Sequence, residues 1–95
     1  MVREKDLFEN HFLNEDSLQL RVVVENDGKL EPLVYKRERL CQEAEKKAQQ
    51  KLYEDYPKAK KIMPNMEILY KLYTEQGGCM LIVRFSAPGL KKELE

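Results

Sequence analysis

The chain has 95 residues, of which 42% are apolar and 36% charged, and its 17 basic and 17 acidic side chains give zero formal net charge. This length excludes two independent hydrophobic cores, so residues 1–95 are expected to form a single domain. Zero net charge argues against a protein that binds nucleic acid mainly by neutralising phosphates. No apolar run approaches the ~20 residues of a membrane span, so no membrane association is expected.

The first predicted element is a helix near the N-terminus. Four side chains within residues 3–13 recur at helical spacing: Leu7, Phe8, His11 and Phe12. They predict a short amphipathic helix inside an N-terminal helical segment, residues 1–14. A helix of this length is unstable alone and has to dock on another part of the fold.

A β-hairpin is predicted next. Residues 17–25 alternate apolar and polar side chains, which is typical of a half-buried strand. The Asp27-Gly28 dipeptide that follows is favoured at the centre of a two-residue hairpin turn. Residues 30–36 are therefore expected to return beside residues 17–25, and Pro32 would place that second strand at a sheet edge.

The longest helix is predicted over residues 37–56. Its apolar side falls on one part of the helical wheel: Leu40, Cys41, Ala44, Ala48, Leu52 and Tyr56. Pro57 ends it, because the residue before a proline avoids the α region. Cys41 and Cys79 are too few for a disulfide framework and adjoin apolar residues, so both are expected to be reduced thiols in the core.

Two further strands complete the predicted sheet. Residues 66–74 fit either a strand or a helix, and their alternation and tyrosines favour a strand. Gly77-Gly78 supplies a turn, and residues 79–86 form the last strand. Residues 87–95 are predicted to be a polar tail, whose last two residues are interpreted as a remnant of cloning.

The predicted fold class is therefore α+β. A short N-terminal helix precedes a ββαββ core over residues 17–86. Its small, mainly antiparallel four-stranded sheet carries the long helix on one face. The N-terminus lacks the apolar stretch of a secretory signal, so a cytoplasmic location is expected.

The last strand raises the question of function. Residues 79–83 are apolar without interruption, so both faces of this strand need cover, and one helix covers only one face. Six apolar residues are predicted on the second face: Val23, Val34, Leu69, Tyr73, Met80 and Ile82. Either the N-terminal helix covers them, or a second copy of the chain does so in a homodimer, face to face or by joining sheet edges. Alternatively, single-stranded nucleic acid stacks there, on Tyr73 with Arg21, Lys36, Lys71 and Arg84.

The sequence carries no catalytic or cofactor motif. His11 is the single histidine, and one histidine with two distant cysteines does not make a metal site. We therefore expect a non-enzymatic module without cofactors or metals, which self-associates, as a homodimer, or binds another protein. Nucleic-acid binding is the alternative function.

Overall fold

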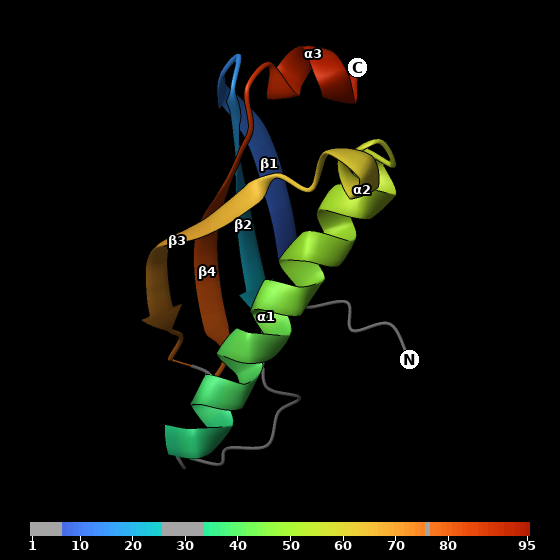
Figure 1. Ribbon diagram of the computed structural model, residues 1–95. Coiled ribbons are helices and arrows are strands. Elements are labelled where there is room, and N and C mark those ends of the chain that lie inside the picture. Colours follow the sequence, from blue (N-terminus) through green and yellow to red (C-terminus); the bar gives the residue numbers. More distant parts are fainter. Residues whose placement is uncertain (1–6, 26–33, 76) are drawn as a thin grey trace.

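The structure is a computed structural model that describes residues 7–25, 34–75 and 77–95, with the backbone alone for residues 34–37 (Figure 1). Within these residues, seven elements follow one another: β1 (Leu7–Asn14), β2 (Ser17–Val24), α1 (Val34–Asp55), α2 (Ala59–Ile62), β3 (Asn65–Tyr73), β4 (Cys79–Ser86) and α3 (Leu90–Leu94).

The four strands form one antiparallel sheet in the order β1-β2-β4-β3. Helix α1 packs on β2 and β4, the two central strands, and so lies on one face of the sheet (Figure 1). We call this the inner face and the opposite side the outer face. The predicted α+β class, the antiparallel four-stranded sheet and the long helix on one face are confirmed.

The prediction of an N-terminal helix is wrong, because its described residues form strand β1. This strand pairs with β2, from Leu7 opposite Val23 to Phe12 opposite Leu18. The turn between them is held by the Asn14 side chain, whose Oδ1 accepts hydrogen bonds from the Asp16 N–H and the Ser17 hydroxyl. Strand pairing outweighs the weak local preference for a helix here.

The predicted hairpin between residues 17–25 and 30–36 is also wrong. Residues 26–33 lie outside the described residues, and the chain from Val34 onward belongs to α1. The neighbours of β2 are β1 and β4, so β2 is a central strand. Its burial fits that place, because Leu18, Leu20, Val22 and Val24 are all buried.

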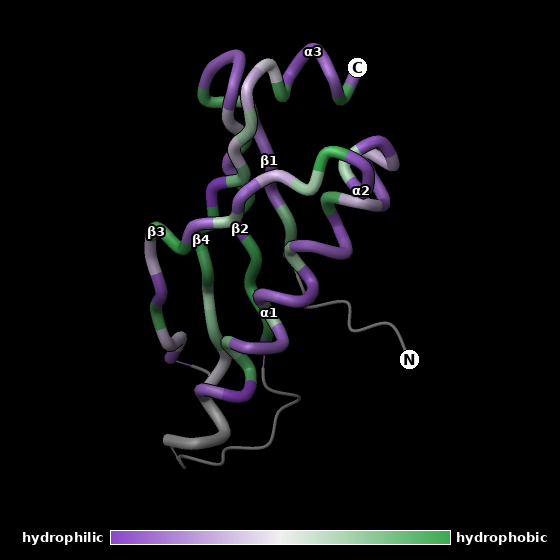
Figure 2. The backbone as a smooth tube through the Cα atoms, viewed as in Figure 1, coloured by the Kyte–Doolittle hydropathy of each residue, from purple (hydrophilic) through white to green (hydrophobic). Residues whose placement is uncertain are grey.

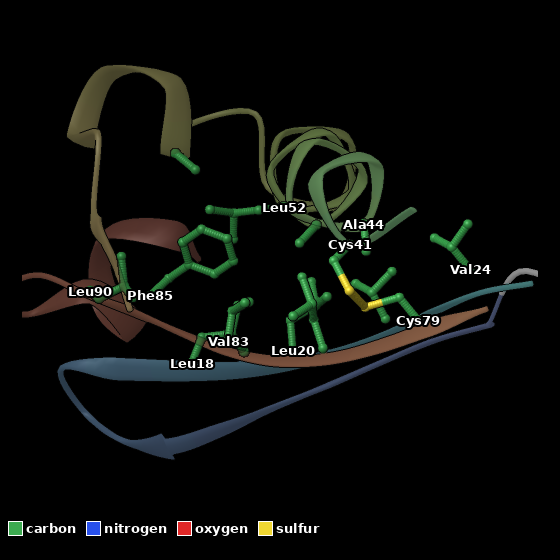
Figure 3. Packing of buried hydrophobic residues seen from close by; sticks show 14 of the residues in the cluster. Leu18, Leu20, Val24, Cys41, Ala44, Leu52, Cys79, Val83, Phe85 and Leu90 are labelled. Carbon is green, nitrogen blue, oxygen red and sulfur yellow. A yellow bond between two sulfur atoms is a disulfide. The ribbon is translucent and has the colours of Figure 1, made fainter. Parts of the chain in front are cut away.

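The hydrophobic core lies between α1 and the inner face. Strands β2 and β4 supply most of the apolar side chains, and both strands are largely apolar in Figure 2 whereas α1 is mostly polar. Ala44 and Ala48 are buried on the helix side, and their small side chains let α1 approach the sheet closely. Phe85 is a large side chain of this core, in the same part of it as Leu52 and Leu90 (Figure 3).

The prediction of reduced thiols is wrong, because Cys41 and Cys79 form a disulfide (Figure 3). Both cysteines are buried in the core, as expected. The bond joins α1 to the start of β4, where the two Cα atoms are 5.2 Å apart, a usual distance for a disulfide. Disulfides persist mainly in oxidising compartments, which weighs against the expected cytoplasmic location.

The prediction of a polar tail is wrong as well. Residues 90–94 form helix α3, and Leu90 and Leu94 are buried against the core. The Lys58 ammonium donates a hydrogen bond to the main-chain oxygen of Glu95 at 2.6 Å, and the Gly89 N–H donates to the Asp16 carboxylate. Leu94 therefore belongs to the core, and the interpretation of the last two residues as a remnant of cloning stays a prediction.

The start of β4 depends on a glycine that leaves no room for a side chain. A Cβ atom at Gly78 would lie 2.3 Å from the carbonyl oxygen of Val24 and 2.9 Å from the Cα of Glu25. Because both contacts are backbone atoms, Gly78→Ala should lower the free energy of unfolding by roughly 3 kcal/mol in urea denaturation. Gly89→Ala is the control, since Gly89 has φ +66° and nothing within 4 Å, and should cost about 1 kcal/mol. Equal losses for the two variants would contradict this close approach.

Candidate interaction surface

Three of the six predicted surface residues lie together on the outer face. The side chains of β4 alternate strictly between the two faces of the sheet, and those of Leu81, Val83 and Phe85 are buried on the inner face. Met80 and Ile82 therefore lie on the outer side, and Val23 faces Met80 across the β2–β4 pair. No element in the described part of the chain covers these side chains.

A β-bulge in β3 changes which residues reach the outer face. Ile68 pairs with Val83 and Tyr70 with Ile82, so Leu69 is one extra residue in β3. An extra residue reverses the assignment of the side chains that follow it. Tyr70 and Leu72 consequently lie on the outer face.

The other three predicted residues lie elsewhere. Tyr73 pairs with Cys79 and packs against the core, so it belongs to the inner side of the sheet and its predicted place is wrong. Val34 is the first residue of α1 rather than part of a strand. Leu69 stands at the bulge and is exposed.

The register brings apolar residues from all four strands together on the outer face. Leu7, Val23, Met80 and Leu72 follow one another across the sheet, and Ile82 and Tyr70 form the next row. We call these six residues the outer patch. At the two sides of the outer patch, Leu7 is 55% exposed and Tyr70 is 49% exposed. Near the middle of the patch, Val23 is only 9% exposed. Sequence reasoning missed Leu7, Tyr70 and Leu72, because the strand at the N-terminus and the bulge carry no clear local signal.

The charged groups of the outer face neutralise one another. The Arg21 guanidinium lies 2.7 Å from the Glu9 carboxylate, and Arg84 forms an ion pair with Glu67. Each of these pairs joins residues that the strand register places directly opposite each other. Two arginines matched by two glutamates leave this face with no net charge from its ion pairs.

The five residues of the alternative nucleic-acid site are not brought together. Arg21 and Arg84 lie on the outer face and are ion-paired, whereas Lys71, opposite Leu81, and Tyr73 lie on the inner side. Lys36 belongs to α1. A single strand could not contact all five on one face.

The side chains that could support catalysis or metal binding are dispersed over the described part of the fold. His11 is exposed on β1 opposite Gln19, and both cysteines are used in the disulfide. Within the described residues, His, Cys, Asp and Glu form no group of three or more that could hold a metal ion. None of the described helices combines the length and the apolar character needed to cross a membrane.

No protein-family model, curated protein or solved structure matches this chain. The role of the outer face is therefore argued from its own residues.

Proposed function

We propose that this protein is a non-enzymatic self-association module whose contact surface is the outer patch. The observation that carries the proposal is the bulge in β3. It adds Tyr70 and Leu72 to Met80, Ile82 and Val23 on a face that no described element covers. Exposed apolar surfaces of this kind, bordered by polar side chains, are typical of protein interaction sites.

Charge favours a second copy of the chain as the occupant. The ion pairs of Arg21 with Glu9 and of Arg84 with Glu67 leave the face neutral, and the whole chain also has zero formal net charge. Two identical faces therefore meet without repulsion, and neither face selects a strongly charged partner. A two-fold contact would place the same patch on both sides of the interface.

The area of the outer face determines how much of it a stable contact has to cover. Four strands of eight or nine residues make a face of about 19 Å by 26 Å at the usual strand spacing and rise. A stable interface buries about 800 Å² of accessible surface on each partner. The contact must therefore extend over most of the face, so it includes the outer patch at one end of the sheet and the two ion pairs in the rows beside it.

Ile82→Glu tests this contact. Ile82 lies on a central strand between Arg21 and Tyr70, so a carboxylate there would lose its water when two faces meet. We expect the variant to halve the molar mass of the assembly, measured by size-exclusion chromatography with light scattering. Circular dichroism would check that the variant is folded.

Ile68→Glu is the matched control for this test. Ile68 is an exposed isoleucine of the same sheet, but its pairing with Val83 places it on the inner side. The control should leave the molar mass unchanged. A folded Ile82→Glu protein with the wild-type mass, or a wild-type protein that is monomeric at high micromolar concentration, would refute the proposed function.

A further inference from the structure

The two edges of the sheet differ in how well they can accept another strand. At one edge, β3 carries the bulge at Leu69 and a lysine at position 71, both of which hinder pairing with a further strand. At the other edge, β1 pairs regularly with β2 from Leu7 to Phe12, and its register shift, between Phe12 and Asn14, lies at the end of the strand. No described strand pairs with its outer side. The backbone N–H and C=O groups along that side are a template for another strand.

The sequence of β1 is symmetric about Asn10. It reads Leu7-Phe8-Glu9-Asn10-His11-Phe12-Leu13, so each residue before Asn10 has a counterpart of matching or complementary chemistry after it. We propose that β1 pairs antiparallel with β1 of a second copy, with Asn10 at the two-fold axis. The two four-stranded sheets then join into one sheet of eight strands. This contact uses the free edge of β1 rather than the outer face, and Leu7 is the only residue of the outer patch that lies on β1.

The pairs beside Asn10 join compatible side chains on the same face. On the inner side, Phe8 faces Phe12 of the second copy, since both residues pair with inward-pointing residues of β2. On the outer side, the carboxylate of Glu9 faces the imidazole of His11. Leu7 would lie near Leu13 of the second copy, where the register of β1 shifts between Phe12 and Asn14.

The inner side of β1 has room for the second copy. Helix α1 packs on β2 and β4, and β1 reaches it mainly through side-chain tips: Lys51 over the Phe8 ring, Asn10 to Asp55, and Phe12 to Tyr56. A hollow of about 220 Å³ lies beside Phe8 and is lined by charged and amide side chains of α1. The ring of Phe12 from the second copy would approach this hollow.

The edge contact and the face contact are geometrically compatible. The two-fold axis of the edge pair is perpendicular to the sheet, whereas the axis of the face contact runs parallel to it. Where two perpendicular two-fold axes intersect, they close an assembly at four copies. A wild-type protein that forms both contacts in this way would be a tetramer, and loss of either contact would leave a dimer.

The test changes the charge at His11, an exposed residue of β1 that is not part of the outer patch. In His11→Glu, the new carboxylate faces Glu9 of the second copy, and like charges directly opposite each other oppose strand pairing. Because His11 is exposed, the fold should persist. Light scattering should show half the wild-type molar mass. His11→Lys places an ammonium opposite the same Glu9 and should keep the wild-type mass, as should Ile68→Lys at the other edge.

The outcomes separate this contact from the face contact. If the edge variant halves the mass and its charge-matched partner does not, the register about Asn10 is supported even when Ile82→Glu has no effect. If His11→Glu keeps the wild-type mass, or if His11→Glu and His11→Lys lose mass equally, the edge contact is refuted. In that case, halving by Ile82→Glu would still support the proposed function.

Discussion

Reduction of the Cys41–Cys79 disulfide should lower the free energy of unfolding by about 4 kcal/mol, the loop-closure value for a separation of 38 residues. The bond restricts the unfolded chain, and it also holds the first half of α1 over the start of β4. Domains of this size have a total stability of roughly 5–15 kcal/mol. The disulfide therefore supplies a large fraction of what keeps the protein folded.

Thermal unfolding with and without a dithiol reductant measures this effect. A loss of 4 kcal/mol corresponds to a fall in Tm of roughly 15–30 °C for a domain of this length. Thiol labelling must show that both sulfurs are free before the comparison, because the bond is buried. Cys41→Ala/Cys79→Ala is the control and should have a low Tm that the reductant does not change. A wild-type Tm that stays the same after complete reduction would contradict this role.

Phe85→Ala should lower the free energy of unfolding by about 4 kcal/mol, as is typical when a buried phenylalanine is truncated. Phe85 is 1% exposed, and its neighbours across the two strand pairs are Leu18 and Met66. Its ring fills the core between the sheet and the side chains of α1 and α3 (Figure 3). Truncation would leave a cavity that the surrounding elements cannot fill without rearranging.

Urea denaturation of Phe85→Ala and Phe85→Leu gives the comparison. Leucine keeps most of the apolar volume, so Phe85→Leu should cost less than about 1.5 kcal/mol. The urea midpoint should therefore fall much further for alanine than for leucine. Equal midpoints for the two variants would show that the volume of the Phe85 side chain does not stabilise the core.

The elements with a strong repeating pattern could be predicted from the sequence. The long helix was predictable because its apolar residues recur with one period over more than five turns. The last strand was predictable because a short apolar run follows a glycine pair. The N-terminal strand was not, because Phe8 and Phe12 are four residues apart, a spacing that fits one face of a helix and one face of a strand.

The candidate surface could be predicted only in part. Met80, Ile82 and Val23 follow from simple alternation along β4 and β2. The bulge at Leu69 reverses the alternation in β3, and nothing in the local sequence indicates it. Simple alternation therefore places Tyr73 on the outer face and Tyr70 and Leu72 on the inner face, the reverse of their positions. The disulfide depends on where α1 crosses β4, which the spacing of two cysteines does not reveal.

The difference between the two edge strands has a consequence for aggregation. If β1 pairs with β1 of a second copy as proposed, the edges of the joined sheet are the two β3 strands. Their extra residue interrupts the regular hydrogen bonding that an incoming strand needs, and pairing there would remove water from Lys71. Growth by strand addition would then stop at β3, so the proposed edge contact would not lead to fibrils.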